Sequence, residues 1–294
     1  MLNLNKEEIT KIKETYNSKD MEESAINIRR KYTKDGNFSV FNLYSLLDTM
    51  VILHDDKEGS LTRYITFKES DRANYLILNA KRTVEEMRFD AACMLRRVLK
   101  QINNENNLVS LNCSVADKAF SREDKHFACA LLMPEKELMK FILQKDESGK
   151  YKYLNDKGEI SFKNINAVAD YFGVPFKQCS SRIFLVFDKL RKEKKGNYFI
   201  EGCYSRSSYK TAKSNYSEEQ KNKDIEEVCP NYKENNELRI NHLLDSLHYR
   251  SYSKLSEIAK RRLLINLAKF DSVNEGVVKS EEEAKSIINN FIAS

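Results

Sequence analysis

Only 8 glycines and 3 prolines occur among the 294 residues, so the chain has few positions that suit tight turns. Charged residues make up 32% of the chain, and most of them are lysine and glutamate, which are good helix formers. The hydrophobic residues, 41% of the total, are enough for one sizeable core and a smaller appended module. We therefore expect an α+β fold that is rich in helix.

A small β-sheet among the helices is predicted by two short runs of β-branched and aromatic residues. RYITF (63–67) and NYLILN (74–79) are each bounded by polar residues, as strands usually are. Before them, FSVFNLYSLLDTMVIL (38–53) has the apolar spacing of one helix face. After them, the 84–102 stretch has helical periodicity, and REDKHFACALL (122–132) predicts another helix, which Pro134 ends.

Two of these helical stretches carry the features by which the chain resembles a known family. RFDAACMLRR (88–97) follows a predicted strand, and EDKHFACALLMP (123–134) comes next along the chain. With AVADYFGVPFKQCSSRI (167–183) behind them, they resemble the zinc peptidases of the ImmA/IrrE family over roughly residues 20–190. The resemblance implies a zincin-like domain, in which two histidines one helical turn apart bind zinc beside a catalytic glutamate.

The residues that such a zinc peptidase needs are replaced in this sequence. The resemblance places the two zinc-binding histidines at Cys93 and Arg97, the catalytic glutamate at Met94 and the third zinc ligand at Glu123. One thiolate and one carboxylate are fewer than the three protein ligands of a catalytic zinc, and an arginine side chain cannot become a ligand. We therefore predict no catalytic residue, no metal and no cofactor, and hence a pseudoenzyme.

A charge pair in place of the metal is the more specific hypothesis. A carboxylate left alone in the former metal site would be costly if buried, and Arg97 could neutralise Glu123 across that site. The alternative is that both side chains point to solvent, where an ion pair contributes little.

Residues 164–190 predict two helices separated by a turn at residues 172–174, in the manner of a helix-turn-helix. The second helix carries side chains of the kinds that contact phosphates and base edges, and the basic segment RKEKKG (191–196) follows it. The candidate nucleic-acid contacts are Lys177, Gln178, Ser180, Ser181 and Arg182. In the resembling family this helix pair can also serve only for packing, so both interpretations stay open.

The expected organisation is a pseudopeptidase domain over residues 1–200, a polar linker or mobile loop over 201–236, and a helical C-terminal extension over 237–294. The favoured function is that of a regulator or inhibitor that binds a protein partner through the former active-site cleft or the C-terminal helices. Family peptidases cleave repressors or act beside toxins in phages and mobile elements, so an antitoxin or an inhibitor of a defence enzyme fits the resemblance. A DNA-binding transcriptional regulator is the alternative, and an active metallopeptidase with a non-standard site is a third possibility.

Partners and location are bounded by charge, hydropathy and cysteine usage. The net charge of +6, with 44 acidic residues interleaved, is only a mild bias toward anionic partners such as DNA. No apolar run approaches the ~20 residues of a membrane span, and no signal core follows the N-terminus, so we expect a cytoplasmic protein without membrane contact. The 6 cysteines include no C-x-x-C pair, which favours buried, reduced thiols over a zinc site or disulfides.

Overall fold

The chain forms two compact units, made of residues 1–128 with 240–294 and of residues 129–239. The computed structural model describes the following residues: 11, 15–16, 20–33, 38–47, 49–54, 61–66, 74–79, 82–104, 111–114 and 120–248. The unit boundaries fall within two helices, α5 (Arg122–Leu132) and α11 (Tyr232–His248). This division differs from the predicted one at residues 200 and 236, and of the predicted C-terminal extension only residues 237–248 lie within the described part.

The first unit contains a four-stranded mixed sheet. Its strands, in spatial order, are β1 (Thr49–His54), β3 (Asn74–Asn79), β2 (Leu61–Thr66) and β4 (Leu111–Ser114). β1 and β3 run parallel, whereas β2 is antiparallel to both β3 and β4. Leu76, Ile77 and Leu78 of β3 are all buried, as expected for an interior strand covered on both faces. The helix-rich α+β fold with a small sheet is thus confirmed.

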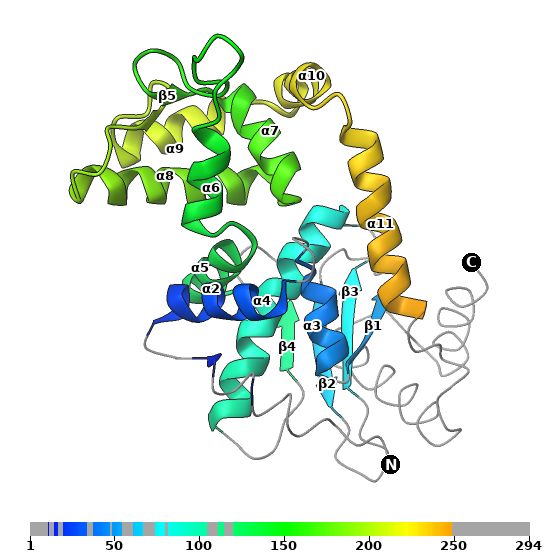
Figure 1. Cartoon of the computed structure of the whole chain (residues 1–294). Helices are drawn as coiled ribbons and strands as arrows, with labels where there is room; N and C mark the ends of the chain where they lie inside the picture. The colour runs from blue at the N-terminus through cyan, green and yellow to red at the C-terminus, as the bar shows by residue number, and fades with distance from the viewer. Residues whose placement is uncertain are drawn as a thin grey trace. The chain divides into compact units, whose positions relative to one another are not determined.

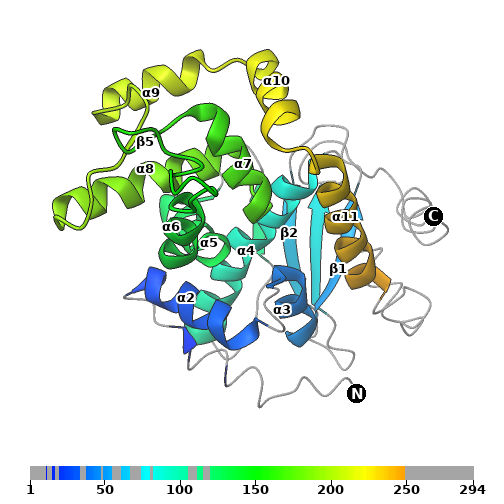
Figure 2. The same ribbon diagram turned by 45° about the horizontal axis from the view of Figure 1, so that its top comes forward.

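Helices cover this sheet. α4 (Val84–Asn104) packs against β2 and β3, and α3 (Val40–Leu46) packs against β1 and α4 (Figure 1). Figure 2 shows α3 and α4 beside the strands in a second view. The Tyr44 hydroxyl donates to the Ala91 carbonyl oxygen at 2.7 Å, which joins α3 to α4. α2 (Met21–Tyr32) begins at Asp20, whose carboxylate accepts from the Glu23 amide.

One predicted helix of this unit is wrong in its second half. The apolar spacing of residues 38–53 predicts a single helix, but α3 ends at Leu46 and β1 begins at Thr49. The run from Met50 to Leu53 contains adjacent β-branched residues and no polar position, which suits a strand that joins a sheet.

The second unit is mainly helical. Besides α6 (Glu135–Ile142), it contains the predicted helix pair, which consists of α7 (Phe162–Phe172) and α8 (Phe176–Lys192). α7 begins at Ser161, whose hydroxyl accepts from the Asn164 amide, and ends at Gly173, whose φ of 58° is left-handed. A two-stranded parallel ladder joins β5 (Glu159–Ile160) to β6 (Phe199–Ile200).

Residues 201–236 are structured, so the predicted linker is wrong. They form α9 (Arg206–Asn215), α10 (Glu218–Val228) and the start of α11 (Figure 1). Their apolar signal is weak because α9 buries only Tyr209 and α10 buries only Asp224. α10 is instead attached to α7 by polar contacts, since the Tyr216 hydroxyl donates to Asp224 at 2.6 Å and accepts from the Asn166 side chain at 2.7 Å.

The sequence predicts buried thiols and no membrane span. The cysteine side chains that the structure describes are all buried, namely Cys93, Cys129, Cys179, Cys203 and Cys229. Among the described helices, none has the length and the apolar character needed to span a bilayer.

Candidate functional site

The positions that the family resemblance singles out lie on α4 and at the start of α5. Cys93 and Met94 are completely buried on α4, where they pack as core residues. Arg97 lies four residues after Cys93, so the two share a helix face. Glu123 is the second residue of α5.

The start of α5 is fixed by a reciprocal pair of hydrogen bonds. The Asp124 amide donates to the Ser121 hydroxyl oxygen at 3.1 Å, and the Ser121 amide donates to the Asp124 carboxylate at 2.9 Å. This is the arrangement of a capping box, with aspartate in the place of the usual glutamate. It holds the Asp124 carboxylate beside the positive end of the helix dipole.

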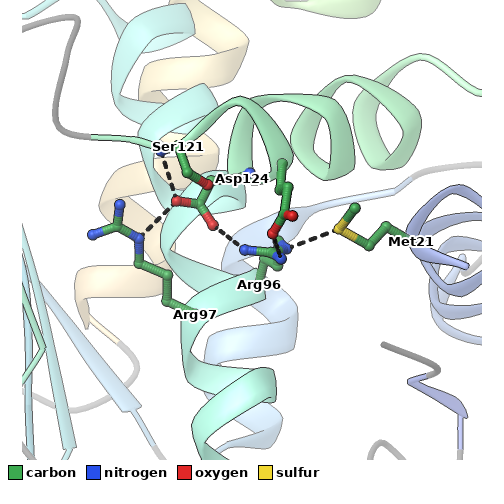
Figure 3. Close-up of polar contacts among 6 residues, drawn as sticks. Met21, Arg96, Arg97, Ser121 and Asp124 are labelled. Atoms are coloured by element: carbon green, nitrogen blue, oxygen red, sulfur yellow. Dashed lines mark hydrogen bonds and ion pairs between the residues drawn. The ribbon is translucent and has the colours of Figure 1, made fainter. Parts of the chain in front are cut away.

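Two arginines of α4 meet this carboxylate (Figure 3). Arg96 Nη1 donates to Asp124 Oδ1 at 2.6 Å, and Arg97 Nε donates to Asp124 Oδ2 at 2.8 Å. Arg96 Nη2 also pairs with Glu123 Oε2, and Arg96 Nε lies 3.1 Å from the sulfur of Met21. We call these four charged residues, Arg96, Arg97, Glu123 and Asp124, the arginine–carboxylate cluster.

Burial differs greatly within the cluster. The Asp124 side chain is 1% exposed and that of Arg96 is 7% exposed, whereas the Arg97 side chain is 23% exposed and that of Glu123 is 59% exposed. Arg96 and Asp124 therefore form a buried ion pair, and Glu123 lies at its solvent-facing rim. Breaking a buried pair costs far more than breaking an exposed one.

The surroundings of Asp124 and Arg96 favour the charged forms of both side chains. Burial alone would raise the pKa of Asp124, but hydrogen bonds from Arg97 and Arg96 and the positive charge of Arg97 bring it below its ordinary value. Burial likewise opposes the charge on Arg96, yet the hydrogen bond and the charge of Asp124 raise the pKa of its guanidinium. Burial also raises the pKa of the nearby Tyr16 hydroxyl, which therefore stays protonated.

The predicted charge pair has different partners in the structure. An interaction between this part of α4 and the start of α5 is present, but Glu123 pairs with Arg96, and Arg97 reaches Asp124 instead of Glu123. Arg96 and Asp124 were missed as site residues. A Ser-x-x-Asp capping signal before an apolar run was available to place Asp124 at a helix start.

These residues do not fit a catalytic zinc ion. Within the part of the chain that the structure describes, no three His, Cys, Asp or Glu side chains are grouped so that they could hold a metal. The oxygens of Asp124 already accept from two guanidinium groups and one amide. Both guanidinium groups are permanently charged and would repel a dication. Met94, where the family resemblance would place a catalytic glutamate, has no group that could accept a proton from water.

The predicted nucleic-acid contacts on α8 are only partly accessible. Ser180 and Arg182 are buried, and Arg182 donates from Nε to the Met133 carbonyl oxygen at 3.3 Å. Gln178 and Ser181 are half-buried, and only Lys177 is exposed.

Helix α9 covers Ser180 and part of Ser181. The Tyr209 ring stacks on Phe184 at 4.6 Å between centroids, and its hydroxyl lies 3.1 Å from the Ser180 oxygen. Lys213 donates to the Ser181 hydroxyl oxygen at 2.9 Å and to the Lys177 carbonyl oxygen at 2.8 Å. The expectation that these five side chains form a DNA-reading face is therefore wrong for Ser180 and Arg182, because Ser180 packs against α9 and Arg182 packs against Met133 inside the second unit.

Comparison of the chain with protein-family models, curated proteins and solved structures gave no match.

Proposed function

We propose that the chain is a non-catalytic binding protein, a pseudopeptidase of the ImmA/IrrE type, that regulates or inhibits a protein partner. The observation that carries this proposal is the arginine–carboxylate cluster. Its two guanidinium groups donate hydrogen bonds to the Asp124 carboxylate at the start of α5. This is the region where a peptidase of this type would bind zinc. A permanent positive charge there can neither bind a metal nor act as a general base.

The rim of the cluster also supports a binding role. The Glu123 side chain is 59% exposed, although it pairs with a buried arginine. A partly exposed charge next to a rigid buried ion pair has a fixed position, and fixed charges give specificity and faster association with a complementary partner. By the family resemblance, the partner would be a repressor or a toxin of a phage or other mobile element, or a defence enzyme of the host.

The test is capture of the partner from the native cell by the full chain, with and without nuclease treatment. We expect nuclease-resistant capture of one protein, which Glu123→Arg weakens at least tenfold because the reversed charge opposes the partner. The matched control is Glu219→Arg, a change at another exposed position, on α10, that should leave capture unchanged.

Three results would overturn the proposal. They are loss of capture after nuclease treatment, equal effects of the two charge reversals, and cleavage of the captured protein that a chelator abolishes.

A further inference from the structure

An exposed tyrosine ring in the second unit ends a stack of aromatic side chains. The Phe141 ring lies between the rings of Tyr153, at 4.7 Å between centroids and 20° between planes, and Tyr171, at 4.2 Å and 28°. Phe141 and Tyr153 are each only 8% exposed, but Tyr171 is 63% exposed. One face of the Tyr171 ring is thus held against a buried ring, and much of its remaining surface is in contact with solvent.

The stack is built on neighbouring elements of one unit. Phe141 lies on α6 and Tyr171 on α7, two helices that pack together (Figure 2). Tyr153 follows the 144–152 turn, in which the Lys152 amide donates to the Gln144 carbonyl oxygen at 2.8 Å. Tyr171 is therefore oriented before any ligand arrives, which lowers the entropy that binding would cost.

Lysines are frequent in the chain segment that carries Phe141 and Tyr153. Segment 140–153 contains two acidic residues and four lysines, namely Lys140, Lys145, Lys150 and Lys152. None of these lysines forms an ion pair with a residue that the structure describes. Lys145 lies over the ring of Tyr151, which is 41% exposed, at 5.4 Å, and Lys152 lies over the Tyr153 ring at 5.3 Å.

Of the nearby carboxylates, Asp146 and Asp170 are engaged within this unit, whereas Glu147 is exposed. Asp146 accepts hydrogen bonds from the Ser148 amide and hydroxyl and from the Lys150 amide, so its side chain is turned into its own loop. Asp170, the neighbour of Tyr171 in the chain, is paired with Arg239 at 2.9 Å. The surface therefore combines ring faces with an excess of positive charge.

We infer that this surface binds single-stranded nucleic acid. Bases stack on exposed aromatic rings with little regard to sequence, and lysines neutralise the phosphates between them. A duplex keeps its bases stacked inside the helix, so Tyr171 has nothing to stack on there. This inference does not depend on the first unit or on the proposed protein partner, and it concerns a surface other than the α8 face discussed above.

Fluorescence anisotropy of a labelled 20-nucleotide oligothymidine, titrated with the full chain at low and moderate salt, tests the inference. Because Tyr171 would stack on one base, Tyr171→Ala should weaken binding about tenfold, whereas Tyr171→Phe should bind as tightly as wild type. Lys145→Gln with Lys152→Gln should reduce the dependence of log K on log salt by about 0.7 for each phosphate that the variant no longer neutralises. The matched control is Tyr204→Ala, since Tyr204 is 62% exposed but meets the Phe199 ring edge-on and donates a hydrogen bond to Glu159, so no ring stacks on its face.

Circular dichroism establishes that each variant is folded. The lysine variants supply the answer if Tyr171→Ala unfolds, because they leave the ring stack intact. Four outcomes would overturn the inference: no binding at low salt, equal loss of affinity for Tyr171→Ala and Tyr204→Ala, duplex binding as tight as single-strand binding, or Tyr171-dependent capture of a protein without any nucleic-acid binding.

Discussion

Replacing Asp124 by asparagine removes one negative charge from the centre of the arginine–carboxylate cluster and changes little else. Asparagine has almost the same shape, and its side-chain oxygen can still accept the Ser121 amide that begins α5. Arg96, with a side chain only 7% exposed, would be left without its buried partner, and Arg97 would no longer face a carboxylate there.

The expected cost follows from burial. Removing one partner of a buried ion pair typically costs about 3–5 kcal/mol, because the remaining charge stays out of water. Arg96 would keep its pair with Glu123 at the exposed rim, so we expect the lower end of this range. The free energy of unfolding of a whole domain is about 5–15 kcal/mol, so Asp124→Asn should remove a large share of the stability of the first unit. Glu123→Gln is the matched control, because that side chain is 59% exposed and exposed pairs contribute at most about 1 kcal/mol.

Urea unfolding at pH 7 measures the difference. With an m-value of about 3 kcal/mol/M, a decrease of about 3 kcal/mol lowers the midpoint by about 1 M, whereas the control should lower it by about 0.3 M or less. Since the two units can unfold separately, hydrogen exchange of α4 should accompany circular dichroism, so that the change is assigned to the first unit. Equal midpoints for the two variants would refute the conclusion that a buried ion pair joins α4 to α5.

Three further predictions test the cluster and the second unit. The free energy of unfolding should depend on acid through Asp124, because the pKa of this carboxyl is lowered in the folded state. Its contribution to stability is complete at neutral pH and is lost as pH falls below about 4. The urea midpoints of wild type and Asp124→Asn should therefore converge at low pH. Elemental analysis should find far less than one zinc per purified chain, and excess zinc should leave the melting temperature unchanged, whereas stoichiometric zinc would contradict the proposed function. In α8, Arg182→Met should destabilise the second unit by about 2–3 kcal/mol, because it leaves the buried Met133 carbonyl without this donor. Its control, Lys177→Met, should change the stability by less than about 0.5 kcal/mol. Equal effects of the two variants would show that Arg182 is not part of the core.

The sequence predicted the parts of the fold whose apolar residues are periodic. The strand at 74–79 and the α7–α8 pair are confirmed, because each buries a continuous set of apolar side chains. α9 and α10 were missed because each buries a single residue and is attached through one tyrosine, by its ring and its hydroxyl, and through carboxylates. Attachment through single tyrosines leaves no hydrophobic period in the sequence, so such helices resemble a linker until their partners are known.

The candidate site was predicted to the level of the two segments but not to the level of the partners. Neighbouring helical residues point about 100° apart. The rotation of α4 about its own axis therefore decides whether Arg96 or Arg97 faces a given carboxylate. Sequence spacing contains no information about that rotation. It is set here by the burial of Cys93 and Met94 and by the capping box at Ser121.

The composition of the cluster bears on what the first unit is for. If stability alone mattered, apolar side chains of similar volume could fill this junction, and they are often as stable as a buried ion pair or more so. A buried arginine that donates from three nitrogens to groups on two helices requires one relative position of those helices, whereas a purely apolar contact tolerates several. Such a constraint is useful to a protein that presents a fixed charge, Glu123, to a partner, and it accords with the binding role proposed above. Replacing Arg96 by methionine together with Asp124 by leucine separates stability from position. The double variant also loses the helix cap at Ser121 and the pair with Arg97, so we expect a smaller loss of stability in urea than for Asp124→Asn, not none. The proposal expects weakened capture of the partner, and unchanged capture would show that the cluster serves the fold alone.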